Sequence, residues 1–287
     1  MLKKIISYVL VVVMVICMNT TTFASDSTTE NDEVQVDGKF IKDNLYASMI
    51  KEKEEIAMQY YLAKVNKDSE ASAKLLNKLK GYSTSSPQLK SGVISPYATS
   101  ARLFISQVPQ EKSYWCGYAA IKSLLDYKGI EKTQGEIAEA VYKKDKDCPW
   151  YLTNGNETSQ FPVAVYLYNM TGAYYIPCPY GAAGTTKITT DMIEPKIVST
   201  IDSGHGVMIL GSSRGDLPND ESKLPGYPSI RVDHWVASDG YEGLGTITWI
   251  VDPAKSKVIS WSKDIEPCYK ITTTKLVAFI KPRGIIW

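Results

Sequence analysis

One cysteine, one histidine, one aspartate and one glutamine of this sequence stand in contexts that suit covalent catalysis. Cys116 begins a stretch of helix-forming residues, and the free N–H groups and dipole at a helix start favour a thiolate. His234 and Asp252 lie far downstream in strand-like runs, and they supply the imidazole and carboxylate that a nucleophilic thiol needs. Gln110, six residues before Cys116, can place its amide N–H near a carbonyl under attack, with the backbone N–H of Cys116 as second donor. These residue types predict acyl transfer by a thiol.

Three neighbouring residues are weaker candidates for these roles. Gln107 lies three residues farther from the cysteine. Asp233 adjoins His234, and adjacent strand residues point to opposite sides. His205 stands between two glycines, so we expect a solvated loop residue there rather than a catalytic base.

The histidine and the aspartate are expected to meet across a β-hairpin. Turn residues 242–245 separate the two strand-like runs. If the connection has an odd number of residues, with Tyr241 opposite Gly245, His234 falls opposite Asp252 on the same face. An even loop would place the two side chains on opposite faces.

The elements that position these residues are expected to be helices followed by strands. Helices are expected over residues 115–127, 134–142 and 191–201. The second helix begins with the reciprocal capping pattern of Thr133 and Glu136. Strands, rich in valine, isoleucine, threonine and tryptophan, are expected over residues 206–210, 231–238, 246–251 and 276–280. Helices followed by antiparallel strands indicate an α+β fold.

The chain divides into four parts. Residues 1–24 contain two lysines and then about 14 apolar residues, which predicts a cleaved signal peptide rather than a membrane anchor. Residues 25–80 are expected to be helical with one apolar face, and to form a propeptide or an N-terminal arm. Residues 81–100, rich in Gly, Ser, Thr and Pro, predict a linker, and residues 101–287 predict one compact domain. A propeptide would give intramolecular inhibition by residues 25–100.

Composition excludes several kinds of partner. The net charge is +1 and 44% of residues are hydrophobic, which is typical of a globular protein and argues against nucleic-acid binding. Only two histidines occur, without a Cys-x-x-Cys pair, so we expect no metal site, and thiol chemistry requires no cofactor. After signal removal no apolar run could span a membrane, which predicts a secreted, extracellular or cell-surface protein.

Export leaves four of the five cysteines in the mature chain. If Cys116 stays a free thiolate, at most two of the other three can pair within the chain. These three adjoin prolines and are expected to be structural thiols or to form one disulfide of undetermined pairing: Cys148, Cys178 and Cys268.

The pattern resembles that of the papain-like cysteine peptidases, in particular the branch similar to bacteriocin-leader-processing (double-glycine) peptidases. Within residues 106–259 the shared elements are a glutamine, Cys-Gly-x-Ala-Ala at a helix start, His-Trp-Val followed by Gly-Tyr, and Val-Asp-Pro. The resemblance implies a papain-like fold, with N-terminal helices packed against an antiparallel sheet. It also implies a role for each candidate: oxyanion donor Gln110, nucleophile Cys116, general base and acid His234, and imidazole orienter Asp252.

The resemblance implies hydrolysis of a protein or peptide substrate through an acyl-enzyme. Tyr118 stands where many relatives have proline, and the Cys-to-His segment is longer than in compact members, so the relatives' substrate preference does not carry over. A transglutaminase-like thiol acyltransferase is an alternative, although its Cys-to-His separation is usually shorter than the 118 residues found here. A catalytically inactive surface-binding module is a third reading.

Overall fold

The computed structural model describes residues 33–36, 39–82, 98–142, 145–153, 159–179, 187–217 and 220–287. The predicted signal peptide and residues 83–97 of the predicted linker lie outside the described residues. All elements below belong to one compact unit, residues 33–287. Helices combine with an antiparallel sheet, which confirms the α+β prediction and is consistent with a papain-like fold. Within the described ranges, no helix is long and apolar enough to cross a membrane.

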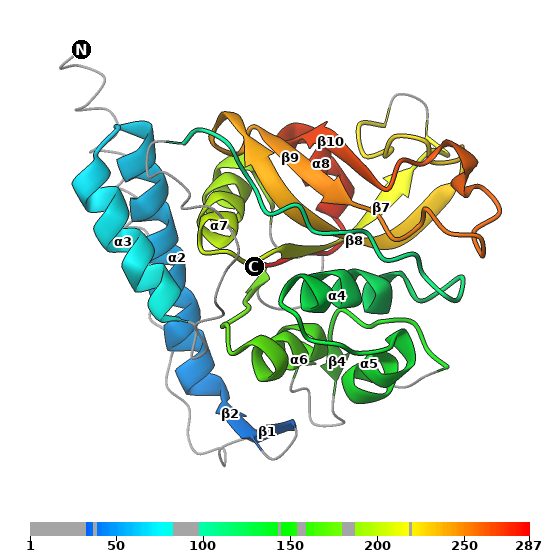
Figure 1. Cartoon of the computed structure of the whole chain (residues 1–287), viewed down its shortest axis with the longest axis horizontal. Helices are drawn as coiled ribbons and strands as arrows, with labels where there is room; N and C mark the ends of the chain where they lie inside the picture. Colours follow the sequence, from blue (N-terminus) through cyan, green and yellow to red (C-terminus); the bar gives the residue numbers. More distant parts are fainter. Residues whose placement is uncertain are drawn as a thin grey trace. The chain divides into compact units, whose positions relative to one another are not determined.

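The main sheet has seven strands in the described part of the chain, each antiparallel to its neighbours. Its strands are β3 (Ala101–Arg102), β6 (Pro177–Cys178), β7 (Val207–Arg214), β8 (Arg231–Glu242), β9 (Ile247–Val251), β10 (Cys268–Thr272) and β11 (Gly284–Ile286). Their order is β10-β9-β8-β7-β11-β6, and β3 pairs with β8. Strands β7 and β8 are the longest, and both lie in the interior of the sheet (Figure 1).

The connection between β8 and β9 is an even loop, the second of the two alternatives that the sequence leaves open. Glu242 pairs with Ile247, so four residues join the strands, and Tyr241 lies opposite Thr248 rather than Gly245. The register of the odd-loop alternative is therefore wrong. A four-residue loop by itself would place the two candidate residues of this hairpin on opposite faces.

A β-bulge in β8 reverses which face of the sheet each following side chain occupies, and so brings His234 and Asp252 to the same face. The pairing shifts by one residue between positions 238 and 240, which adds one residue to β8 relative to β9. Beyond the bulge the last pair is Ala237 with Val251, the residue before Asp252. His234 therefore shares a face with Asp252, but it lies two positions beyond the residue directly opposite. The two side chains meet on a diagonal.

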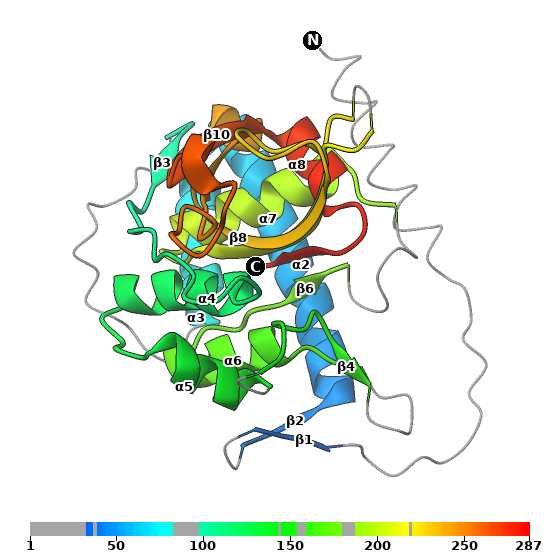
Figure 2. The same cartoon turned by 90° about the vertical axis from the view of Figure 1, so that its right-hand side faces the viewer.

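Helices α4 (Cys116–Tyr127), α5 (Gln134–Val141) and α6 (Pro162–Thr171) form a group on one side of β8 (Figures 1 and 2). Helices α4 and α5 confirm two predictions to within one residue. The predicted capping box is present, since the Thr133 hydroxyl accepts from the Glu136 N–H at 3.1 Å and the Glu136 carboxylate accepts from the Thr133 N–H at 2.8 Å. Helix α6 was not predicted.

Helices α7 (Thr190–Asp202) and α8 (Thr273–Ile280) lie on the other side of β8 (Figure 2). The helix expected over residues 191–201 is confirmed by α7, but the strand expected over residues 276–280 is wrong. The Thr272 hydroxyl caps α8 by accepting from the Lys275 N–H at 3.2 Å. The buried residues of α8 recur at helical spacing, so its β-branched composition was misleading.

The N-terminal region forms a hairpin of two helices, α2 (Asp43–Val65) and α3 (Ser69–Gly81), within the stretch that the sequence predicts to be helical. Asp68 starts the second helix by accepting from the Ala71 N–H at 3.0 Å. Before them, β1 (Glu33–Val36) pairs with β2 (Lys39–Lys42), which the sequence did not indicate. Whether this region is a propeptide or an arm stays a prediction.

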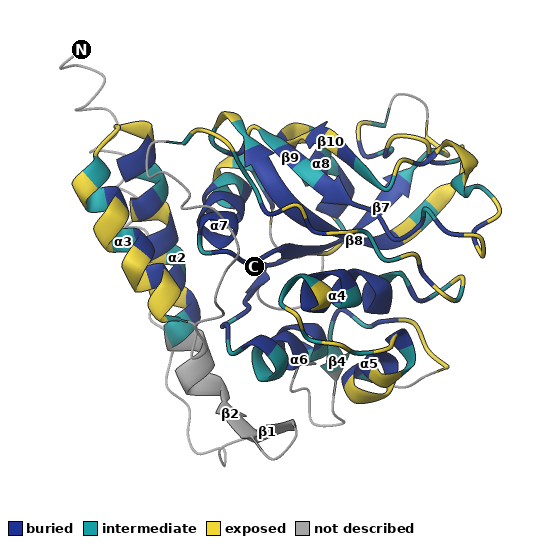
Figure 3. Cartoon of the chain, viewed as in Figure 1, coloured by how far each residue is buried: buried dark blue, intermediate teal, exposed yellow. Residues whose placement is uncertain are grey.

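Helix α2 packs its apolar face against α7. The buried residues of α2 recur every three or four positions, and Figure 3 shows this buried face beside the exposed outer surface of α3. They are Ile50, Lys53, Ile56, Ala57, Tyr60, Ala63 and Lys64. The two lysines in this set are each satisfied by partners from other elements: Lys53 donates to the Tyr174 and Trp287 carbonyls, at 2.7 and 2.9 Å, and Lys64 pairs with Asp202.

Candidate active site

Cys116 is the first residue of α4 and lies against β8. The Trp235 backbone N–H points at its sulfur, with an N···Sγ distance of 3.5 Å. The thiol is free and partly exposed. Its position gives the sulfur both access to solvent and the unpaired N–H groups of a helix start, which favour an anion.

His234 connects the sulfur to the carboxylate of Asp252. Its Nε2 lies 3.0 Å from Asp252 Oδ1, and its ring also forms a hydrogen bond with Cys116. Because Nε2 faces the carboxylate, Nδ1 is the nitrogen left for the sulfur. The structure therefore brings together three of the four candidate side chains, from α4, from β8 and from the position after β9.

The electrostatics of this group favour a charged imidazole. Burial of the ring works against the cation, but the neighbouring Cys116 and Asp252 outweigh burial and raise the pKa of His234 to about 10. For Asp252 burial alone would raise the pKa, but His234 and the hydrogen bonds around the carboxylate hold the pKa below its ordinary value. The arrangement therefore favours a charged His234 imidazolium between Cys116 and Asp252.

Asp252 is fully buried and accepts from four donors. On Oδ1 these are His234 Nε2 and the backbone N–H of Ala254, the latter at 2.9 Å. On Oδ2 they are the hydroxyls of Tyr227, at 2.8 Å, and Tyr269, at 2.7 Å. The sequence pattern indicates neither tyrosine, because neither lies near Asp252 along the chain.

Gln110 lies in the turn that leads into α4. Its Nε2 donates to the Lys112 carbonyl at 2.8 Å, and the same carbonyl accepts the Trp115 N–H at 3.0 Å. The side chain is buried, and its Oε1 has no hydrogen-bond partner among the described residues. A primary amide has a second N–H, and that hydrogen is the one an oxyanion donor needs. Gln110 is thus held by the turn that ends at the cysteine.

The turn after Asp252 fixes Gln110 as well as the carboxylate. The Gln110 N–H donates to the Pro253 carbonyl at 3.1 Å, and the Ser256 hydroxyl donates to the Gln110 carbonyl at 2.6 Å. Ala254, in the same turn, donates to Asp252. One short segment therefore positions two of the candidate residues.

The weaker candidates have other partners. Gln107 donates to the Lys255 carbonyl at 3.2 Å, and Asp233 pairs with Arg231 at 3.0 Å on the exposed side of β8. The expectation that His205 is a solvated loop residue is wrong, since it is buried. Burial, followed by the charges of Lys128 and Lys53, holds the pKa of His205 well below its ordinary value.

The remaining cysteines within the described residues are unpaired. Cys148 is buried, and burial raises the pKa of its thiol, with the nearby Cys116 adding to the effect. Burial likewise raises the pKa of Cys178 to about 11 and raises that of Cys268. Such thiols resist ionisation and are poor nucleophiles. The described residues include no group of three potential metal ligands from His, Cys, Asp and Glu.

Comparison with known proteins points to the same part of the chain. The model of the Peptidase C39-like family matches residues 103–276. This range includes all four candidate residues, α4 and the β8–β9 hairpin. No curated protein matches the chain.

Proposed function

The chain belongs to the Peptidase C39-like family, and from this premise we propose that it is a secreted cysteine peptidase that hydrolyses peptide bonds. The observation that carries the proposal is the double hydrogen bonding of His234, to Cys116 on one side and to Asp252 on the other. A histidine bound in this way can both stabilise a thiolate and deliver a proton.

In the proposed reaction each candidate has one task. The Cys116 thiolate attacks the carbonyl carbon of the substrate amide, and the backbone N–H of Cys116 with the free N–H of Gln110 stabilises the oxyanion. His234 gives its proton to the leaving amine, which leaves a thioester on the sulfur. The neutral imidazole then takes a proton from water, whose oxygen attacks the thioester carbonyl. The C–S bond breaks, which releases the acid and returns the Cys116 thiolate beside the imidazolium.

Asp252 acts by holding the imidazole. It accepts from Nε2 and thereby fixes the ring so that Nδ1 faces the sulfur. No cofactor enters these steps. The proposed substrates are proteins or peptides, and the proposed extracellular location rests on the predicted signal peptide of residues 1–24.

The proposal is tested with purified protein, an unstructured protein substrate and peptidoglycan stem peptides. Cys116→Ala and His234→Ala should abolish cleavage, and iodoacetamide should label Cys116 in the wild type. Cys268→Ala is the matched control, because Cys268 is a partly exposed thiol in β10 whose pKa is raised. Retained cleavage by Cys116→Ala would eliminate the nucleophile.

Two other outcomes separate the alternatives. Labelling of Cys116 together with amine incorporation, but without hydrolysis, would identify an acyltransferase. Neither labelling nor turnover would identify an inactive binding module.

A further inference from the structure

We propose that Tyr227 and Tyr269 are positioning residues that keep Asp252 ionised and fixed in orientation, and thereby hold the His234 imidazolium toward Cys116. The inference rests on the proposed function. It concerns a pair of hydroxyl groups that the sequence pattern does not single out.

The need for these hydroxyls follows from the burial of Asp252. A carboxylate removed from water favours its neutral form unless hydrogen bonds replace the lost hydration. The backbone N–H of Ala254 and His234 serve Oδ1, whereas Oδ2 receives only the two tyrosines among the described residues. Without them one oxygen of a buried anion would have no donor.

Tyrosine suits this task because the hydroxyl stays protonated. Burial, followed by the charge of Asp252, raises the pKa of Tyr227 and of Tyr269 well above the ordinary value. Each hydroxyl therefore donates over the whole physiological range. Tyr227 also packs its ring against the His234 imidazole, with ring centroids 5.8 Å apart, so it contacts both members of the pair.

The two tyrosines reach Asp252 from different elements. Tyr269 belongs to β10, which pairs with β9 directly before Asp252. Tyr227 belongs to the segment between β7 and β8. Because the donors approach from independent elements, rotation of the carboxylate would break hydrogen bonds to both.

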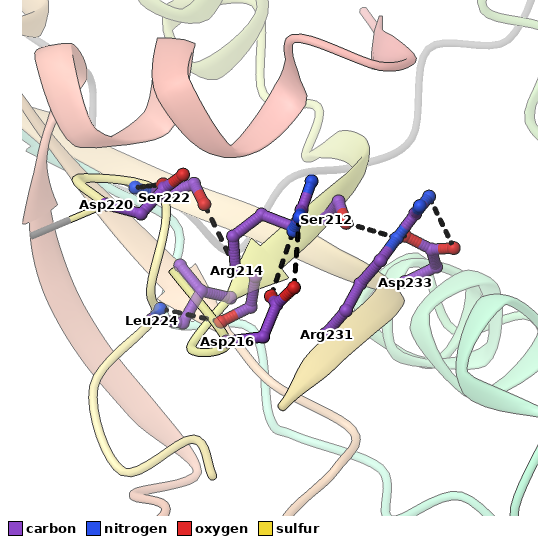
Figure 4. A network of polar contacts seen from close by, with 9 residues as sticks. Ser212, Arg214, Asp216, Asp220, Ser222, Leu224, Arg231 and Asp233 are labelled. Carbon is purple, nitrogen blue, oxygen red and sulfur yellow. Dashed lines mark hydrogen bonds and ion pairs between the residues drawn. The ribbon is translucent and has the colours of Figure 1, made fainter. Parts of the chain in front are cut away.

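The segment that carries Tyr227 is held by polar contacts where it leaves β7 and where it enters β8, which Figure 4 shows from close by. Arg214 forms a two-bond ion pair with Asp216, at 2.9 and 3.0 Å, and Arg231 forms another with Asp233. Two serine hydroxyls add hydrogen bonds to these ion pairs. The Arg214 N–H donates to Ser222 and the Leu224 N–H donates to Ser213, each at 3.0 Å.

The segment is also fixed close to Tyr227 itself. Gly226 has a φ of +75°, and a Cβ there would lie 2.2 Å from the Asp264 carbonyl oxygen. A side chain at this position would push the segment away from Asp264. The neighbouring Tyr227 would move with it.

Asp252 controls the orientation of His234 toward Cys116. When Asp252 takes up a proton at acidic pH, His234 stays charged, but Nε2 loses its charged acceptor and the ring is no longer held with Nδ1 toward the sulfur. Removal of a hydroxyl donor destabilises the carboxylate and raises its pKa, so the oriented His234–Cys116 contact, and with it the rapid labelling of Cys116, should be lost at a higher pH.

The experiment measures the rate of iodoacetamide labelling of Cys116 against pH in the full chain. A hydrogen bond to a charged group corresponds to roughly one pH unit or somewhat more, so Tyr227→Phe and Tyr269→Phe should each move the acidic edge upward by about one unit. The double variant should move it further. Tyr61→Phe is the matched control, because the Tyr61 hydroxyl donates to the Glu194 carboxylate at 2.9 Å outside the site.

A purely structural role would lower the melting temperature and leave the edge in place, which would overturn the proposal. Gly226→Ala provides a second test that removes no hydroxyl, and it should shift the edge in the same direction; an unchanged edge would count equally against the inference. Wild-type labelling with this edge but without peptide cleavage would refute only the proposed function. Normal cleavage with unshifted tyrosine variants would refute only the positioning role.

Discussion

The buried ion pair between α2 and α7 makes a quantitative prediction about the N-terminal hairpin. Lys64 Nζ lies 2.5 Å from Asp202 Oδ2, and both side chains are at most 1% exposed. Asp202 also accepts from Tyr60, at 2.7 Å, and from Tyr241 of β8, at 2.9 Å. Lys64→Met would remove the only cation that pairs with this carboxylate within the described residues.

The magnitude follows from the burial of the remaining charge. Loss of one partner from a buried ion pair typically costs about 3–5 kcal/mol, because the other charge stays in the interior uncompensated. For a domain of this size 1 kcal/mol corresponds to roughly 2–4 °C in melting temperature, which predicts a fall of about 6–20 °C. The two tyrosine donors still bind Asp202, so the lower half of this range is expected.

The assay is urea unfolding with thermal melting of the purified chain. Lys122→Met is the matched control, because Lys122 pairs with Asp126 at 2.8 Å within α4 but on the surface. Such exposed pairs, four residues apart on a helix, typically contribute about 0.3–0.5 kcal/mol. If Lys64→Met lowered the free energy of unfolding by less than about 1 kcal/mol, or by no more than the control, the claim that Lys64 of α2 is needed to stabilise buried Asp202 would be refuted.

Two further predictions concern the candidate site. Gly117→Ala places a Cβ 2.3 Å from Cys148 Cβ and 2.9 Å from Trp235 Cδ1, so it should cost about 1–3 kcal/mol in unfolding free energy and slow the labelling of the adjacent thiol; labelling at the wild-type rate would contradict this packing. Imidazole NMR should show His234 charged up to about pH 10 and His205 neutral to well below pH 6.5, and a His234 that titrates near 6.5 would be inconsistent with the ion pair. Because the folded-state pKa of His234 is raised, its contribution to stability is complete below about pH 6.5 and is lost as the pH rises through 10.

The sequence predicted the parts of the site that depend on local patterns. A helix that starts at Cys116 follows from residue propensity, and the capping residues Thr133 and Glu136 define the start of α5. The α+β order of elements follows from the same reasoning. These features depend on neighbours in the chain, which is why they can be predicted without tertiary structure.

The register of the β8–β9 hairpin could not be obtained from loop length alone. Asp239 is the extra residue of the bulge, and its buried carboxylate accepts from Arg102 Nε and from the Ile105 N–H, both at 3.1 Å. The Asp-Gly pair inside a strand-like run is a bulge signal that could have been used. The partners that stabilise the bulge come from a distant segment, so the sequence could not show how many residues the bulge adds.

Tyr227 and Tyr269 illustrate a different limit. Nothing in the residues around them distinguishes these tyrosines from others, since their role depends on a carboxylate reached only when β10 and the β7–β8 segment are in place. The error at α8 has a different origin, because the signals for this helix are local. Valine and isoleucine content suggested a strand there, whereas the cap at Thr272 and the helical spacing of buried residues decide for a helix.

The contacts of the α2–α3 hairpin bear on the choice between a propeptide and an arm. Its buried groups reach α7, Tyr241 near the end of β8 and the backbone of Trp287, rather than Cys116 or His234. Removal of the hairpin would leave Asp202 as a buried anion without its cation and would expose the apolar surface that α2 covers. A cut in residues 83–97 should therefore leave the hairpin bound to the part of the chain that follows it. This argues for an arm that stabilises the fold, and it separates that role from any inhibition exerted by other residues between 25 and 100.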